Sequence, residues 1–194
     1  MKNFLTLLVV SLILGFSVKW FALEVFTVPT DSMEPTILRG GKVWVNKVTL
    51  GFFNKNNIVS FERFGENFVK RIVGVPQDTV YFDGQKFQIL GKNQNFFTKN
   101  IYNYSLFIIP KKGQKIFFDE KNRDFYLPLI EKYEEVQAGN IIGKIFINNA
   151  ETDHYTFKYN YYFLQGDNTE GSIDSRDWGL IAQKNIFGKV LFYD

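Results

Sequence analysis

The chain has 194 residues, with 23 Lys and Arg against 20 Asp and Glu, so its formal net charge at pH 7 is +3. This length accommodates one domain, or one domain with an insertion, and so small a charge gives no reason to expect a nucleic-acid partner. The chain has no Cys and one His, which excludes disulfides, thiol catalysis and a multi-histidine zinc site.

The N-terminal segment is apolar from Phe4 to Val18, interrupted only by Gly and hydroxyl residues. As a helix, residues 4–21 would be about 27 Å long, which nearly spans a hydrocarbon core of about 30 Å. Lys19 can extend its ammonium towards the headgroups, and Trp20 suits the interface. We therefore expect residues 1–23 to form a membrane anchor. A cleaved secretory signal and a buried helix of a soluble protein are the alternatives, although no small-x-small cleavage site follows.

Beyond this segment, short apolar runs are bounded by Gly, Pro, Asn or Asp, which is typical of strands, and the aromatic content of 18% favours the same structure. Residues 124–136 have helical spacing, with Pro128 expected in the first turn. Residues 92–103 are expected to form a loop, and Asp83-Gly84 predicts a hairpin. The expected strands are 42–48, 58–61, 67–75, 79–82, 86–90, 114–118, 141–147, 161–164 and 186–193. The prediction is a mostly β body behind one N-terminal transmembrane helix.

The first polar motif is Pro29-Thr30-Asp31-Ser32-Met33-Glu34-Pro35-Thr36. Two prolines and clustered Thr, Asp and Ser predict an extended, turn-rich loop. Taken alone, the motif is equally consistent with a linker that carries a solvated Ser.

Lys70 is the second feature, because it lies within an apolar run beside Val69 and Ile72. Strand alternation with the ammonium facing water is the simple interpretation. The alternative is a buried lysine that loses its proton, since burial lowers a lysine pKa of about 10.4 by up to about 3 to 5 units. Such an amine can activate a Ser hydroxyl without His. With a single His, His154, in the chain, we expect any base for acyl transfer to be Lys, Asp or Glu.

The third feature is Gly166-Asp167-Asn168-Thr169-Glu170-Gly171-Ser172-Ile173-Asp174-Ser175-Arg176, which is dense in small polar residues. It lacks the ligand spacing of an EF-hand, so a calcium loop is not expected. A surface loop is the remaining simple interpretation.

Together these three segments resemble bacterial type I signal peptidases. The family has a Ser-Met-x-Pro-Thr box, matched by Ser32 to Thr36, and a Lys-Arg-x-x-Gly-x-Pro-Gly-Asp box, matched by Lys70 to Asp78 except at Gln77. Its Gly-Asp-Asn-x-x-x-Ser-x-Asp-Ser-Arg box is matched by residues 166–176. Three boxes in the family's order behind an anchor are specific evidence for this family, whereas a single box would be weak evidence. Gln77, Gly41-Lys42 and Asn56-Asn57 depart from the usual turn residues of the family but do not touch the boxes' reactive side chains.

The resemblance implies a serine endopeptidase with a Ser-Lys dyad, in which Ser32 is the nucleophile and Lys70 the general base. It implies an oxyanion hole made by the Ser32 backbone N–H and the Thr30 hydroxyl, and Ser172 as the residue that orients Lys70. The implied supporting charges are Asp174 and Arg176 as an ion pair, with Arg71 near Asp167 or Asp174. The implied substrate-binding residues, in shallow pockets for small side chains, are Phe26, Val28, Met33, Phe68 and Val69. No metal and no cofactor are expected.

The same resemblance implies an antiparallel β-sheet catalytic domain formed by residues 24–84 and 161–194, with residues 85–160 as a β-rich inserted subdomain. The expected partners are preproteins that carry signal peptides and the lipid bilayer. The expected location is the cytoplasmic membrane, crossed once, with the catalytic domain outside the cytoplasm. Two alternatives stay open: a narrow-client relative of the same fold that matures pilins or a few secreted proteins, and an inactive membrane-tethered binding domain. A soluble self-cleaving repressor is disfavoured by the apolar start of the chain.

Overall fold

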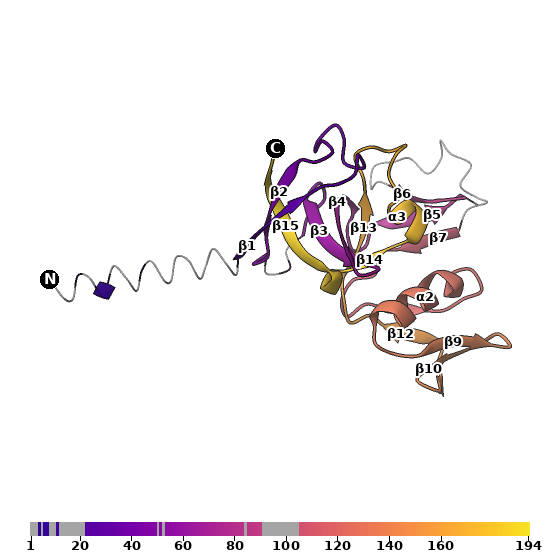
Figure 1. The fold of residues 1–194 in the computed structure, drawn as a ribbon. Helices are drawn as coiled ribbons and strands as arrows, with labels where there is room; N and C mark the ends of the chain where they lie inside the picture. The colour runs from indigo at the N-terminus through magenta and orange to yellow at the C-terminus, as the bar shows by residue number, and fades with distance from the viewer. Residues whose placement is uncertain are drawn as a thin grey trace.

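The computed structural model describes residues 4, 6, 7, 11, 22–49, 51, 53–83, 85–90 and 105–194. These residues form antiparallel sheets with few helices, so the prediction of a mostly β, antiparallel fold is confirmed (Figure 1). Within the described ranges, no helix has the length and apolar character needed to cross a bilayer. Most of the predicted anchor, and the loop expected at 92–103, lie outside the described residues.

The main sheet has seven strands in the order β1-β2-β15-β3-β4-β13-β14. Its neighbours are antiparallel throughout, and the last strand of the chain, β15, lies between β2 and β3. The bounds are β1 Leu23–Thr27, β2 Lys42–Asn46, β3 Ile58–Arg63, β4 Glu66–Gly74, β13 Tyr161–Gln165, β14 Ile181–Ala182 and β15 Ile186–Tyr193.

Both faces of this sheet are covered, because the apolar side chains of the central strands alternate between two clusters. On β3, Ile58 packs with Val28, Met33 and Val45, whereas Val59 packs on the opposite side with other apolar residues. Period-two alternation sends successive side chains to opposite faces. The second cluster consists of Phe53, Val59, Phe61, Ile72, Tyr162, Leu164, Ile181 and Ile186. A strand buried on both faces is held in register, which fixes the β3–β4 pair that carries Lys70.

The segment between β4 and β13 forms three small sheets, in the orders β6-β5-β7, β12-β8 and β11-β10-β9, with helix α2 packed among them (Figure 1). The α2 helix contributes five side chains to the largest apolar cluster. The bounds are β5 Thr79–Phe82, β6 Phe87–Leu90, β7 Ser105–Ile108, β8 Lys115–Phe117, α2 Arg123–Tyr133, β9 Ala138–Ile141, β10 Lys144–Ile147, β11 Ala150–Glu151 and β12 His154–Thr156. The one-turn helix α3 (Ser175–Trp178) and the 3-10 turn η2 (Gln183–Asn185) follow later.

Two local predictions are wrong. The run expected as one strand at 141–147 is a hairpin, because Ile142 and Gly143 adopt φ of 52° and 80° and turn the chain between β9 and β10. Pro128 lies inside α2 and not in its first turn, because the helix starts at Arg123, after a turn in which Asp119 accepts hydrogen bonds from two backbone N–H groups.

Candidate active site

Ser32 is positioned by a loop whose continuation is anchored in the core. Directly after Ser32 the chain makes a helical turn in which the Ile37 N–H donates to the Met33 carbonyl at 3.0 Å. Met33 and Ile37 are both fully buried. The Ser32 carbonyl accepts a hydrogen bond from the Asn168 N–H at 3.2 Å. The loop that the prolines predict is therefore held at both ends, and the Ser32 side chain has a defined position.

Lys70 approaches Ser32 from β4. The Lys70 Nζ donates a hydrogen bond to the Ser32 Oγ at 2.5 Å, and the Thr30 Oγ1 lies 3.1 Å from the same oxygen. Both partners of the shorter contact are buried, with Ser32 7% and Lys70 3% exposed. The structure thus brings Lys70 to Ser32 and its neighbour Thr30, although Lys70 and Ser32 are 38 positions apart in the sequence.

Burial is the main influence on the Lys70 amine, and it lowers the pKa of Lys70 from 10.5 to about 8. The negative charges of Asp174 and Asp167 act in the opposite direction, and the positive charge of Arg176 adds to the lowering. Desolvation penalises the ammonium more than the amine, so a substantial neutral fraction exists near neutral pH. A neutral amine in contact with a hydroxyl is the arrangement that abstracts a proton.

The segment at 166–176 supports this pair through Asp174, which is completely buried. Its carboxylate accepts from the Gly166 N–H, from the Arg176 N–H at the start of α3, and from the Arg176 guanidinium at 2.8 Å. Burial raises the pKa of Asp174, but these hydrogen bonds together outweigh it and leave the pKa below its ordinary value. The expected Asp174–Arg176 ion pair is present and fixes the loop as a folded unit.

The loop must begin with glycine because position 166 lies against the Ser32 loop. A Cβ at this position would lie 2.4 Å from the Ser32 carbonyl oxygen and 2.2 Å from the Ser172 Oγ. No real Cβ tolerates such contacts with backbone, so the close approach of this loop to the Ser32 loop requires the absence of a side chain.

Arg71, next to Lys70, pairs with Asp167 and not with Asp174. Its Nε and Nη2 donate to the two carboxylate oxygens at 2.7 and 2.6 Å. This two-point contact connects β4 to the loop that holds Asn168. It raises the pKa of Arg71 mainly through the hydrogen bonds that the guanidinium donates to Asp167. The pair therefore ties the Lys70 strand to the Ser32 loop through rigid, charge-assisted hydrogen bonds.

Ser172 is buried next to Gly166, but its Oγ makes no hydrogen bond of good geometry with a described residue. It lies close enough to Asp174 to help lower the pKa of that carboxylate. The expected contact between Ser172 and Lys70 is not among the hydrogen bonds of the described residues.

A cavity of about 330 Å³ opens in front of Ser32 and Lys70. Of the side chains expected to bind substrate, Phe26, Val28, Phe68 and Val69 line it. Met33 does not, because it is fully buried in the cluster that includes Val28. The cavity also has lining residues that the boxes do not specify: Thr27, Ser60, Glu66, Asn67, Gly171 and Ile173. Apart from Gly171 and Ile173, which fall within the third box at its unspecified positions, these residues carry no motif in the sequence.

The single histidine takes no part in the contacts of Ser32. His154 lies on β12, where its Nδ1 is 2.6 Å from the Asp153 Oδ1. Across the described ranges, no group of three His, Asp or Glu side chains is arranged to hold a metal ion.

The chain is similar to known proteins over most of its length. The family described as "Signal peptidase, peptidase S26" matches residues 1–193. Signal peptidase IB of Staphylococcus aureus strain COL is 31% identical over 94% of this chain and 83% of its own length. The signal peptidase I of Buchnera aphidicola from Baizongia pistaciae is 30% identical over 93% and 72%, and that of Aquifex aeolicus is 28% identical over 91% and 78%. On these matches, the chain belongs to the signal peptidase family, peptidase S26.

Proposed function

We propose that this protein is a signal peptidase I, which removes N-terminal signal peptides from exported preproteins after small-x-small sequences by means of a Ser32–Lys70 dyad. The observation that carries the proposal is the buried contact between the Lys70 Nζ and the Ser32 Oγ at 2.5 Å, with the pKa of Lys70 lowered to about 8. A buried hydroxyl in contact with a lysine of lowered pKa is suited to nucleophilic catalysis without histidine.

In the acylation step, the neutral Lys70 amine accepts the Ser32 hydroxyl proton as the Ser32 Oγ bonds to the carbonyl carbon of the scissile peptide bond. The carbonyl oxygen becomes an oxyanion, to which the Ser32 backbone N–H and the Thr30 hydroxyl donate. The Thr30 Oγ1 is 3.1 Å from the Ser32 Oγ, which supports this role. The Lys70 ammonium then gives its proton to the leaving amine as the C–N bond breaks, and the mature protein departs.

In the deacylation step, Lys70 is again a neutral amine and accepts a proton from water as the water oxygen attacks the Ser32 ester. The ester C–O bond breaks and Lys70 returns the proton to the Ser32 Oγ. The product is the signal peptide with a free carboxyl group. We assign the orientation of the Lys70 amine to the buried Ser172 hydroxyl, whose oxygen would accept a hydrogen bond from a Lys70 N–H.

The substrate is proposed to bind as an added strand along β4. Ile72 exchanges hydrogen bonds with Asn56 and Asn57 on the β3 side, so the alternate residues Val69 and Asn67 direct their backbone groups to the opposite side. There β13 pairs with β4 only from Arg71 onwards. The cavity in front of Val69 therefore borders an open strand edge, and an extended chain suits such an edge. Val28, Phe68 and Val69 leave space for small side chains.

We also propose that residues 1–23 anchor the protein once in the cytoplasmic membrane, with the β body outside. The apolar sequence of residues 4–18 supports this. Further support comes from Val25 on β1 and Phe192 on β15, which flank Trp44 of β2 from either side and are 52% and 68% exposed. An exposed apolar strip beside the N-terminal end of β1 suits contact with lipid.

The test is cleavage of a synthetic signal-peptide substrate bearing Ala-x-Ala by the detergent-solubilised full chain, compared with its Ser32→Ala variant. Wild type is expected to cut after the second Ala, and Ser32→Ala is expected to be inactive with an unchanged circular dichroism spectrum. Cleavage by both proteins, or by neither although both are folded, would contradict the proposal.

A further inference from the structure

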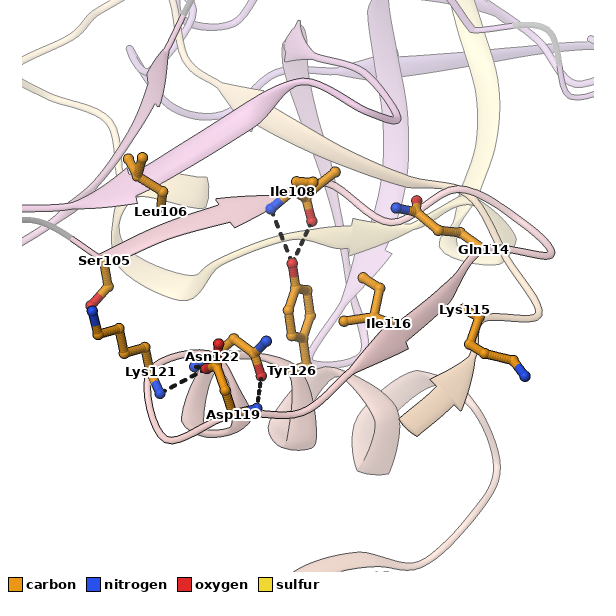
Figure 2. Close-up of a pocket in the computed structure, with 10 residues that line it drawn as sticks. All are labelled: Ser105, Leu106, Ile108, Gln114, Lys115, Ile116, Asp119, Lys121, Asn122 and Tyr126. Atoms are coloured by element: carbon orange, nitrogen blue, oxygen red, sulfur yellow. Dashed lines mark hydrogen bonds between the residues drawn. The ribbon is translucent and has the colours of Figure 1, made fainter. Parts of the chain in front are cut away.

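A second cavity lies in the insertion, between two strands that belong to different sheets. It has a volume of about 470 Å³ and is bordered by β7 on one side and β8 on the other, with Tyr126 of α2 rising between them (Figure 2). Ten residues line it: Ser105, Leu106, Ile108, Gln114, Lys115, Ile116, Asp119, Lys121, Asn122 and Tyr126. We call this cavity the insertion groove.

The β7 strand presents an open edge to the insertion groove. Its partner β5 lies on the other side, where Ile109, just beyond the strand, donates to the Asp78 carbonyl at 2.8 Å. Alternate residues of an antiparallel strand face opposite edges, so Leu106 and Ile108 direct their backbone groups into the groove. The Tyr126 hydroxyl occupies both groups of Ile108, accepting from its N–H at 3.0 Å and donating to its carbonyl at 2.9 Å (Figure 2). No hydrogen bond within the described chain occupies the outward groups of Leu106.

The β8 strand presents a matching edge from the opposite side. Its bonds to β12 are made by Ile116 and by the flanking Gln114 and Phe118, the last of which donates to the Asp153 carbonyl. The backbone N–H and carbonyl groups of Lys115 and Phe117 therefore face the groove. The Asn122 side chain donates to the Phe117 carbonyl at 2.9 Å. The outward groups of Lys115 have no partner among the residues that the structure describes, so each edge keeps one residue whose N–H and carbonyl are both uncapped.

The charge at the insertion groove is positive. Lys115 and Lys121 line it, and Lys111 and Lys112 precede it on the same exposed turn. The lining carboxylate, Asp119, is already engaged, since its Oδ1 accepts from the Lys121 and Asn122 N–H groups at 2.8 and 2.7 Å. Exposed Leu106 and Ile108 side chains add an apolar component.

From these observations we propose that the insertion groove binds an extended acidic polypeptide segment, which adds as a strand to the Leu106 and Lys115 edges. Backbone hydrogen bonds to the uncapped edge residues provide the pairing, as in other cases of strand addition. The lysines select acidic side chains, and Tyr126 and Asn122 limit the site by capping the next residue along each edge. The site is separate from the Ser32 cavity, so the proposal does not depend on the proposed function.

The test is fluorescence anisotropy of a labelled eight-residue peptide of alternating Glu and Val, titrated with the full chain in detergent. We expect this peptide to bind, and its Lys-Val analogue and an N-methylated form that lacks backbone donors to bind about tenfold more weakly or worse, from the loss of charge pairing and of two or more hydrogen bonds. An N-methylated peptide that binds equally well would overturn strand addition, and the absence of binding by the Glu-Val peptide would overturn the site.

Two sets of variants locate the binding. Leu106→Pro removes one outward donor while leaving the bonds to β5, because proline is tolerated where an edge N–H faces outwards. Lys115→Glu with Lys121→Glu reverses the charge, and this pair tests the site even where the proline variant is unstable. Each is expected to weaken binding about tenfold with cleavage of the Ala-x-Ala peptide unchanged. Lys42→Glu with Lys144→Glu, two exposed lysines outside the groove, is the matched control, and an equal loss there would overturn the assignment.

Discussion

Lys70 has two properties that conflict with one another. Its burial makes the amine available as a base, and the same burial makes the ammonium a source of instability below the lowered pKa. Its neighbours Asp174 and Asp167 favour the ammonium without restoring the ordinary pKa. Activity and stability are therefore expected to depend on pH through one residue, and each can be measured separately.

The pH dependence of cleavage follows from the neutral amine being the active form. With a Lys70 pKa of about 8, kcat/KM should fall about tenfold per pH unit well below that value and level off above it. Measurement between pH 6 and 10 on the Ala-x-Ala peptide provides the check. A flat profile, or one that continues to rise up to pH 10 as for an exposed lysine, would contradict a buried lysine base.

The stability prediction concerns Lys70→Met. Folding lowers the Lys70 pKa from 10.5 to about 8. Between pH 8 and pH 10.5, Lys70 is therefore protonated in the unfolded chain and mostly neutral in the folded protein. The cost of burial is therefore fully present below pH 8 and disappears as the pH rises to 10.5. Lys70→Met should raise the free energy of unfolding at pH 7 by about 1–3 kcal/mol and much less at pH 10.5, while cleavage falls by at least about 10²-fold.

Denaturant titrations at the two pH values measure this difference. Exposed Lys121 supplies the control, since Lys121→Met should change stability little at either pH. Equal stabilisation of Lys70→Met at pH 7 and pH 10.5 would mean that packing, and not the charge, is responsible.

At the scale of elements, the active geometry depends on the loop at 166–176 lying against the Ser32 loop. Gly166→Ala places a methyl group within 2.4 Å of the Ser32 carbonyl, so the two loops must separate. A displacement of about 1 Å at a reacting group can cost about 10²-fold in rate, and we expect a loss of that order in cleavage. Gly139 on β9 is the matched control, because a Cβ there meets nothing within 4 Å. Equal activity of the two alanine variants would contradict the role of this contact.

Strand periodicity and the three boxes predict much of this arrangement, and their limits have physical causes. Lys70 could be located from the sequence because charge inside an apolar run is visible locally. That Arg71 pairs with Asp167 and not Asp174 depends on the register of β4 against β13, which no local pattern specifies. Ser60 and Asn67 border the Ser32 cavity only because β3 and β4 pair there. The sequence predicts one strand across Ile142 because a β-branched residue rarely adopts the positive φ of a hairpin turn.

At the scale of the whole molecule, the largest apolar cluster joins residues 85–160 to the main body, meaning the part of the chain that carries the seven-stranded sheet. Phe107, Phe125 and Ile130 from residues 85–160 pack in one cluster with Tyr161 and Leu180. Arg63 of β3 donates to the Tyr133 hydroxyl of α2 at 3.2 Å across the same boundary. Side chains that share a core unfold together, so cooperativity should extend over both parts.

Ile130→Ala tests this cooperativity. The side chain is fully buried in α2, and its truncation should lower the free energy of unfolding by about 2–5 kcal/mol. Fluorescence of Trp44 and Trp178, which lie in the main body, and far-ultraviolet circular dichroism should shift to the same new midpoint. Ile141→Ala, at a 61% exposed position, should leave both midpoints nearly unchanged. A fluorescence midpoint that does not move with Ile130→Ala would show that the two parts unfold independently.

The place of β15 in the main sheet has a consequence for the order of events in biosynthesis. Residues 186–193 occupy the position between β2 and β3, and the Lys70 strand pairs directly with β3. While these residues are still in the ribosome, β2 and β3 have no strand between them and the sheet is divided. The Ser32 loop, held through β2 and the first apolar cluster, cannot then be fixed against Lys70. Under the proposed mechanism, the nascent chain therefore has no assembled nucleophile and base until β15 has left the ribosome and joined the sheet between β2 and β3.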